Sequence, residues 1–560
     1  LATVVTTVTG AQSKAAISNT VATIDVGSTI AEKPITSTGD LLSGAASGVQ
    51  VITAGAVGGG SRIRIRGQSS LSLNNAPLVY VDGIRVESGN VSDQGTGGSN
   101  PSALDNIAPE DIETIDVVKG PAAATLYGTQ AANGVILITT KRGKAGTTRW
   151  NAYAENGLLN DSNKGNYPEL WVGFDNHTGK PTPCLLTSQE SGSCHIDSLF
   201  HNNVLNNPIT TPLHTGNRQQ YGAQVSGGAT ALQYFLSADV QHEQGPYKMP
   251  QIEINRLMAE RGTSIGDDQI YPNALKQVNL RTNLSTQFSS KADAAVSVGY
   301  TGQYIRRPQN EDNSDGLMVD ALGTGARTDL VDGRGIPLLG YRNYPMGDIF
   351  AQRTTTQTNR FISSFTAHYY PLSWLTARTN LGYDNSAIND VFLQEYNQGP
   401  YNDSFRNSST NGTAQSSRGE NDVYTVDVGA TANGTRGKFN SKLSAGVQYF
   451  RNYYSVTRGD GQNLPPGGTT TTAGAVQTTS QSTTESINLG TYGEEVLSYA
   501  DRVFLTGGLR YDANSAFGQS FSGVYYPKIG LSWLVSDESF FPKINAINSL
   551  RLRGTYGASG

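Results

Sequence analysis

Four runs of residues decide the fold of this chain: RIRIRG at 62–67, PLVYVDG at 77–83, EDIETIDVVKGP at 110–121 and AAATLYGTQAANGVILITTK at 122–141. The first run alternates arginine with isoleucine, which is the pattern of a strand with one face in water. The second run is a short apolar stretch that ends in Asp82-Gly83, a pair typical of turns. Together the runs predict a compact α/β unit.

The later runs supply helices and further strands of the same unit. Ile112, Ile115, Val117 and Val118 predict a helical turn that leads into a strand. Pro121 can open a short helix, because its missing N–H costs little at a first helical position. The turn pair Asn133-Gly134 then leads into a strand over 135–140, which is rich in β-branched residues. We therefore expect a small mixed sheet with short helices.

The segment before these runs is polar and gives weaker signals. Residues 1–30 contain a short extended-type run at 4–9, which fits either a frayed terminus or a peptide that adds as a strand to a partner's sheet. Asp40 is the expected N-cap of a short helix that ends at Gly44 or Gly48. A strand is expected to follow over 49–52.

The composition favours a large β-barrel. Of the 560 residues 37% are apolar, which is below the usual range for a globular protein. Charged residues make up 16%, which is too few for a disordered chain. Strands whose alternate residues face water and lipid reconcile these values. A net charge of −5 creates no basic field for nucleic acid. The sequence also lacks an apolar run of about 18 residues, so a membrane-spanning helix is not expected.

From residue 149 onward, alternating segments of about ten residues recur and predict about thirteen strands. They cover 149–158, 220–228, 232–242, 278–288, 292–304, 360–370, 375–383, 423–432, 438–449, 487–497, 502–512, 524–534 and 550–556. Tight turns join successive pairs at one end, while long excursions over 159–217, 306–358 and 386–420 lie at the other, as in outer-membrane barrels. Aromatic residues gather near the strand ends. The alternative is a soluble, tyrosine-rich β-sandwich or propeller, which the strand length and the lack of repeats disfavour.

The chain has two cysteines, Cys184 and Cys194, in a polar loop. Their spacing and the absence of other cysteines favour a disulfide across that loop, which fits an oxidising compartment. Two unpaired surface thiols are the alternative.

Residues 40–143 resemble the plug of the SusC/RagA family of TonB-dependent outer-membrane transporters. The resemblance rests on the four runs quoted above. The residues of this motif are Arg62, Arg64, Arg66, Gly67, Asp82, Gly83, Lys119, Tyr127, Gly128, Asn133 and Gly134. Val4, Val5 and Thr6 look like the TonB box of this family, although Leu1-Ala2-Thr3 departs from the acidic residue often found before it.

This resemblance implies a plug inside a barrel of twenty-two strands in the bacterial outer membrane. It also implies energy from the TonB complex, a surface lipoprotein lid of the SusD type, and a bulky nutrient such as a glycan or peptide as cargo. Accordingly, residues 1–30 are expected to form the N-terminal segment, 31–146 the plug, and 147–560 the first part of the barrel. Only about 13 of the 22 strands fit in the sequence, so further strands are expected after Gly560.

No enzymatic chemistry is expected. The six histidines lack metal-ligand spacing, and neither a phosphate loop nor a nucleophile elbow is present in the sequence. We therefore expect no cofactor and no metal site. The cluster of Asp82 with Arg62, Arg64 and Arg66 is better explained as polar plug residues that form ion pairs with a polar barrel wall.

The predicted function is TonB-dependent import of a bulky nutrient across the outer membrane, in which TonB pulls on the N-terminal segment and displaces the plug. A non-transporting surface protein, such as an adhesin or scaffold, is the first alternative. A soluble carbohydrate-binding or hydrolytic β-protein is the second. The sequence does not identify the cargo.

Overall fold

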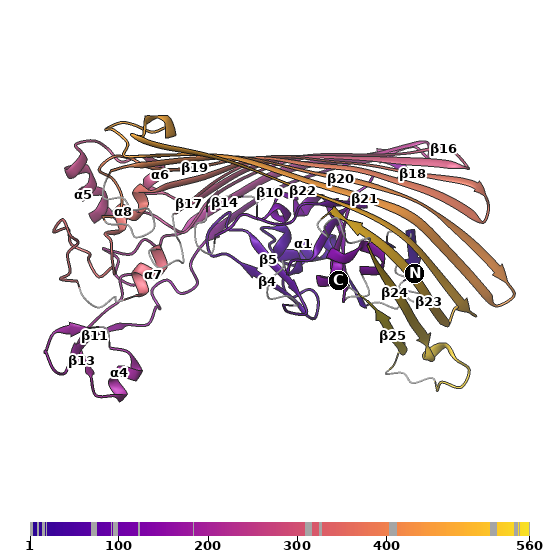
Figure 1. The fold of residues 1–560 in the computed structure, drawn as a ribbon, viewed down its shortest axis with the longest axis horizontal. Coiled ribbons are helices and arrows are strands. Elements are labelled where there is room, and N and C mark those ends of the chain that lie inside the picture. The colour runs from indigo at the N-terminus through magenta and orange to yellow at the C-terminus, as the bar shows by residue number, and fades with distance from the viewer. Residues whose placement is uncertain are drawn as a thin grey trace.

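A large curved sheet holds the N-terminal domain against its concave face (Figure 1). The computed structural model describes residues 4–558 except 8–9, 14–16, 18–19, 69–74, 91, 93, 95–98, 121–123, 183, 309–315, 324–327, 402–410, 516–522, 543–546 and 548. We refer to the N-terminal domain as the plug and to the large sheet as the wall.

The plug is built on a five-stranded sheet in the order β3-β8-β9-β6-β7. Its strands are β3 (Thr20–Asp25), β6 (Leu78–Val81), β7 (Ile84–Val86), β8 (Ile112–Lys119) and β9 (Val135–Thr140). β6 and β9 are parallel and the other pairs are antiparallel, so the predicted mixed sheet is confirmed. β3 lies within the segment 1–30, so the sheet begins before the expected plug boundary at residue 31.

A second hairpin and several short helices complete the plug. The hairpin joins β4 (Val49–Thr53) to β5 (Ser61–Ile65), whose isoleucines are buried, as the alternation predicts. The helices are α1 (Val26–Glu32), α2 (Thr38–Leu42), η1 (Ala103–Asn106), η2 (Pro109–Asp111), α3 (Ala124–Tyr127) and η4 (Thr129–Asn133). Apolar side chains of both sheets, such as Ile63, Val117 and Ile136, form the plug core.

Two local predictions were wrong. Ser37 rather than Asp40 caps α2: its Oγ accepts from the Asp40 N–H at 3.3 Å, while the Asp40 carboxylate accepts from the Ser37 N–H at 3.1 Å. Asp40 therefore completes a capping box from the third helical position. The predicted helical turn over Ile112–Val118 is strand, because these residues pair with β9, and the turn lies earlier, in η2. The expected helix start at Pro121 lies outside the described residues.

The wall is one antiparallel sheet of 13 strands in chain order, which confirms the predicted number. The strands are β10 (Gly146–Leu159), β14 (Gly216–Gly228), β15 (Leu232–Gln244), β16 (Ala274–Ser289), β17 (Ala292–Pro308), β18 (Arg353–Leu372), β19 (Leu375–Gln394), β20 (Thr413–Arg436), β21 (Phe439–Gln462), β22 (Val476–Tyr499), β23 (Val503–Asn514), β24 (Val524–Leu534) and β25 (Arg551–Gly557). β10 and β25 form its two edges, so the sheet is not closed.

Several strands are much longer than the ten residues expected from the alternation. β20, β21 and β22 each have 24 residues. A tilted strand needs only about 9–11 residues to cross a bilayer, so the remainder extends beyond the apolar zone, where alternation fades. For this reason much of the excursion predicted over 386–420 is strand, since β19 ends at Gln394 and β20 begins at Thr413.

The two rims of the wall differ as predicted. Residues 229–231, 290–291, 373–374, 437–438 and 500–502 form tight turns at what we call the short-turn rim, where the connection 535–550 with η7 (Val535–Asp537) is the exception. The long-loop rim carries α5 (Gln251–Arg261), α6 (Asp267–Ile270), α7 (Leu317–Leu322), α8 (Met346–Ala351) and η5 (Thr471–Ala473). It also carries a finger made of β11 (Leu170–Asp175), β12 (Pro181–Thr182), α4 (Leu186–Glu190) and β13 (Cys194–Asn202) (Figure 1).

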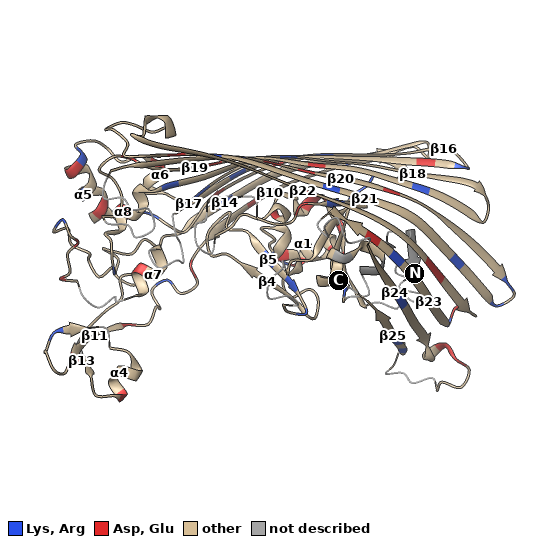
Figure 2. Cartoon of the chain, viewed as in Figure 1, with Lys and Arg blue, Asp and Glu red and all other residues tan. Residues whose placement is uncertain are grey.

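Side chains alternate across the wall. On β17, Val296, Tyr300 and Tyr304 are each 39% exposed on the convex face, whereas Ser297, Thr301 and Gln303 are buried against the plug side. Charged residues stand on the loops of the long-loop rim and near the turn ends of the strands (Figure 2). An apolar exterior with a polar interior matches a membrane-spanning wall.

None of the helices in the described part of the chain has the length and apolar character needed to cross a membrane.

Candidate functional site

The plug meets the wall through buried ionic contacts, and this plug–wall interface is the candidate functional site. Arg281 of β16 lies between two plug carboxylates. Its Nε donates to Asp111 Oδ2 at 3.3 Å, and its Nη1 lies 4.0 Å from Asp82 Oδ2. Both carboxylates also accept from wall hydroxyls, Asp111 from Ser237 at 2.5 Å and Asp82 from Ser297 at 3.0 Å. Because the Arg281 side chain is only 5% exposed, these ionic contacts are largely desolvated.

The turn between β6 and β7 aims the Asp82 carboxylate. Asp82 and Gly83 both have positive φ, 48° and 86°, as a tight hairpin turn requires. The carboxylate then accepts from the Thr140 N–H at 3.0 Å and from its hydroxyl at 2.6 Å, which fixes it beside the wall. The predicted ion pair between a polar plug residue and the wall is therefore present at Asp82.

For Arg62, Arg64 and Arg66 the same expectation stays a prediction. In the described part of the chain none of them forms an ion pair with the 13 wall strands. Arg62 and Arg66 are exposed, while the isoleucines of β5 enter the plug core. Arg64 Nη1 donates to the carbonyl of Ile63, at 3.2 Å.

Other wall arginines bind the plug through its backbone. Arg360 donates to the carbonyl oxygens of Ala103 and Glu87, and its Nε and Nη2 also donate to Asp384, each at 2.8 Å. Arg510 donates to the Leu126 carbonyl at 3.1 Å while it pairs with Asp512 at 2.8 Å. Each guanidinium is therefore neutralised by a wall carboxylate and still has N–H groups for plug carbonyls.

Arg307 of β17 acts similarly. It is fully buried and donates to the Ser99 carbonyl and, at 3.1 Å, to the Ser92 hydroxyl. We call Arg281, Arg307, Arg360 and Arg510 the wall arginines. Sequence reasoning missed all of them. The available signal was an arginine at a plug-facing position of an alternating strand, since such a position requires acceptors inside the barrel.

The plug apex, residues 54–60, is tied to the wall by Asn273. Its side-chain oxygen accepts from the Val57 N–H at 2.9 Å, and its Nδ2 donates to the Val57 carbonyl at 2.9 Å. Nδ2 also reaches the Arg306 carbonyl, at 3.2 Å. The apex packs tightly: a Cβ at Gly60, whose φ is +78°, would lie 2.0 Å from the Asn100 carbonyl oxygen. Asn273 thereby links this wall segment directly to the plug backbone.

A polar cavity of about 230 Å³ lies between the apex and the concave face of β15–β17. Gln241, Glu243, Gln277 and Gln303 line it from the wall. On the plug side Asp105 lines it, and burial raises the pKa of this carboxyl to about 6, although the Gly39 N–H donates to it at 3.2 Å. Amides and carboxyls of this kind can hydrogen-bond a polar solute.

The remaining motif residues hold the plug together rather than forming one site. Lys119 is 5% exposed and donates to the Ser47 carbonyl at 2.7 Å; burial and nearby arginines lower its pKa. Tyr127 is buried, with its ring 5.2 Å from that of Tyr80. Positive φ values distinguish the glycines of the motif, Gly67, Gly83, Gly128 and Gly134. Asn133 ends η4 just before the last of these.

The N-terminal segment forms a separate hairpin of β1 (Val4–Thr7) and β2 (Gly10–Ser13). The predicted TonB-box residues Val4, Val5 and Thr6 lie in β1, and positions 8–9 of the same run lie outside the described residues. Among the described strands β1 pairs with β2 alone, which leaves its other edge without a ladder. Such an edge can accept a further strand.

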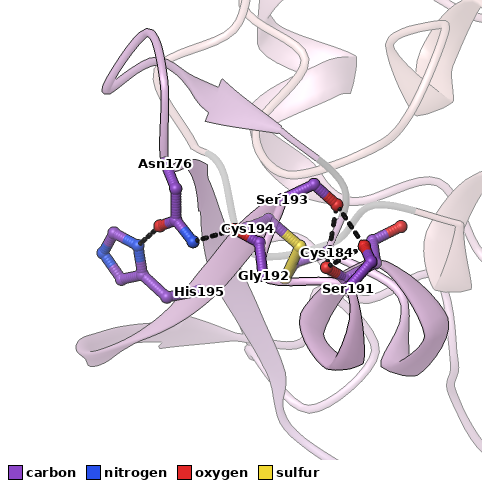
Figure 3. The surroundings of a disulfide bond; sticks show 8 residues. Asn176, Cys184, Ser191, Gly192, Ser193, Cys194 and His195 are labelled. Carbon is purple, nitrogen blue, oxygen red and sulfur yellow. Dashed lines mark hydrogen bonds between the residues drawn. A yellow bond between two sulfur atoms is a disulfide. The ribbon is translucent and has the colours of Figure 1, made fainter.

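The finger at the long-loop rim is held by a disulfide between Cys184 and Cys194 (Figure 3). Asn176 supports it from the end of β11: its Nδ2 donates to the Gly192 carbonyl at 2.8 Å, and its Oδ1 contacts His195 Nδ1 at 2.5 Å. The finger therefore projects as a unit that is cross-linked by its own disulfide.

The other long loops form a second apolar core. It contains Leu213, Leu257, Tyr341 and Phe350, together with Ala56 of the plug apex. Ion pairs also join its helices: Arg256 of α5 binds Glu253 at 2.6 Å and Asp348 of α8 at 2.8 Å. The described parts of these loops are thus packed against one another and against the apex.

Two family models match the chain. "TonB-dependent Receptor Plug Domain" matches residues 13–135, and "TonB dependent receptor-like, beta-barrel" matches residues 300–559. The chain is 25% identical to TonB-dependent receptor P39 of Formosa agariphila over 93% of its own length and 46% of that protein. It is 24% identical to TonB-dependent receptor SusC of Bacteroides thetaiotaomicron over 95% of its own length and 52% of that protein. The chain thus spans about half the length of these curated relatives.

Among solved structures the fold is similar to that of the RagAB peptide transporter. The TM-score is 0.70 at 17% identity, and the match covers 97% of this chain and 60% of that one. At this identity the likeness concerns the fold.

Proposed function

The chain belongs to the TonB-dependent receptors of the bacterial outer membrane, and on this premise we propose that it takes part in energised import of a bulky polar nutrient of the glycan or peptide class. The observation that carries the proposal is a folded plug held in a wall by contacts that can be released, among them ion pairs and hydrogen bonds to backbone carbonyls. Such contacts exchange readily with water once the interface opens.

In this proposal the cargo binds beneath the folded loops, in the polar cavity at the plug apex. The N-terminus lies toward the short-turn rim (Figure 1). Outer-membrane barrels have short turns on the periplasmic side, which is the side of TonB. TonB would add a strand to the free edge of β1 and pull, and the plug would shift along the wall. A SusD-type lipoprotein on the long-loop rim is the proposed extracellular partner.

The first test concerns β1. Val5→Pro removes an N–H and disfavours strand addition, whereas Val5→Thr preserves the β-branched strand former and serves as the matched control. We expect Val5→Pro to lose capture of the periplasmic domain of TonB and Val5→Thr to retain it. Equal capture by both variants would refute strand addition at this segment.

The second test concerns transport. In the native host, disruption of the gene should abolish growth on one class of glycan or peptide, and the intact gene should restore that growth. A gene that lacks codons 1–10 should restore surface binding of the nutrient but not growth. Unchanged growth after disruption on every nutrient class would instead favour a non-transporting adhesin or scaffold.

A further inference from the structure

The convex face of the wall carries a polar notch directly above an apolar band. Across β15–β18 the outward side chains of the band include Leu236, Leu280, Tyr300 and Phe361, which are 39–47% exposed. Positions of this kind face lipid in a membrane barrel. The next two outward rows toward the long-loop rim are different in character, and they define the notch.

Strand register places the residues of the notch side by side. Val240, Val278, Gly302 and Asn359 form one row, and His242, Lys276, Tyr304 and Gln357 form the next. Together they line a hollow of about 400 Å³. Gly302 contributes no side chain to the hollow, and the Tyr300 phenol lies beside it, 3.2 Å from the position that a Cβ would take.

The notch offers positive charge and hydrogen-bond donors without a carboxylate. Lys276 is its permanently cationic residue, and Asp and Glu are absent from both rows. Tyr300 Oη donates to Asn359 Oδ1 at 3.0 Å, which orients the amide so that Nδ2 faces away from Tyr300. Within the described residues neither Asn359 Nδ2 nor Lys276 Nζ has an acceptor. An ammonium beside amide and phenol donors suits a phosphate oxyanion.

We propose that this notch binds the phosphorylated headgroup of an anionic lipid in the outer leaflet. The long-loop rim faces the cell exterior in barrels of this kind, so the notch lies at the level of outer-leaflet headgroups. A lipid is favoured over a free anion because the apolar band continues directly below the notch, where acyl chains would cover Leu280 and Phe361. The headgroup would lie over Gly302, with Lys276 and Asn359 as its donors.

The experiment uses the full chain in an uncharged detergent, with bound lipid counted by native mass spectrometry. The probe is diphosphoryl lipid A in mixed micelles, and phosphatidylcholine and inorganic phosphate are the comparison ligands. Lys276→Gln removes the cation. Gly302→Leu places a side chain in the hollow; its Cβ would lie 3.2 Å from Tyr300 Oη, so the end of the Tyr300 side chain must shift by a few tenths of an ångström. Lys291→Gln, at the short-turn rim, is the matched control.

We expect the apparent affinity for lipid A to fall about five- to tenfold in Lys276→Gln, as loss of one charge-assisted contact predicts. It should fall by a similar factor in Gly302→Leu, whose side chain occupies the headgroup position, and be unchanged in the control. Retention of the heat-modifiable folded form would confirm that the variants fold. Equal binding of lipid A by wild type and Lys276→Gln would overturn the proposal. So would competition by millimolar inorganic phosphate, which indicates a free-anion site, or equal binding of phosphatidylcholine.

Discussion

Replacing Arg281 with methionine is expected to destabilise the plug without dismantling the wall. The substitution removes the cation shared by Asp82 and Asp111 and leaves both carboxylates facing a polar but water-poor interface. Breaking a buried ion pair from one side costs about 3–5 kcal/mol, because the remaining charge is uncompensated.

Protonation limits the size of this effect. Neutralising a carboxyl of ordinary pKa at pH 7 costs about 4 kcal/mol, and less for Asp111, because burial already raises its pKa. We therefore expect a loss of about 3–4 kcal/mol in the free energy of plug unfolding, which is a factor of roughly 10²–10³ in the opening equilibrium. The loss should shrink as the pH is lowered toward 5, since protons then replace the missing cation.

Hydrogen exchange of the β8 amides measures this free energy, because β8 is an interior strand of the plug sheet, paired with β3 and β9. Adding Asp111→Asn to Arg281→Met should restore part of the protection. Arg418→Met, at an exposed position on the convex face of β20, is the matched control and should exchange as wild type does. Wild-type protection in Arg281→Met, or absence of rescue in the double variant, would refute the assignment of Arg281 as the plug's ionic anchor.

Two further predictions concern the plug interior and the finger. Burial raises the pKa of Asp105 to about 6, so the carboxyl binds a proton more tightly in the folded plug than in the unfolded chain. The free energy of plug unfolding should therefore fall as the pH rises from about 4 to 6. Asp105→Asn should remove that slope and raise the unfolding free energy at pH 7.5 by up to about 3 kcal/mol in the same exchange assay; a persistent slope would contradict it. Cys184→Ser should destabilise the finger by about 2–3 kcal/mol and make residues 160–215 the first site of limited proteolysis, whereas cleavage at the wild-type rate would show that the disulfide is dispensable.

Features set by neighbouring residues could be predicted from the sequence. The turn at Asp82-Gly83, the buried isoleucines of β5 and the 13 wall strands all follow from local alternation and turn chemistry. Strand ends were less predictable, because the long strands continue into water, where the alternation loses its physical cause.

The plug–wall contacts could not be predicted, because their partners are remote in sequence. Arg281 and Asp111 are 170 residues apart, and Arg510 reaches a carbonyl 384 residues away. A backbone carbonyl has no sequence signature, so three of the wall arginines, Arg307, Arg360 and Arg510, bind a feature that every residue supplies. The arginines at 62–66 stand out through their pattern, yet in the described part of the chain none of them forms an ion pair with the wall.

The position of β3 decides how the plug would respond to mechanical load. Beyond the β1–β2 hairpin, a pull from the N-terminus reaches Thr20, which is paired with Lys119 at the outer margin of the five-stranded sheet. Because β3 pairs with β8 alone among the described strands, its ladder can separate bond by bond while β6, β8 and β9 keep their own pairing. Traction at the N-terminus would therefore detach β3 before it distorts the other strands of the plug sheet.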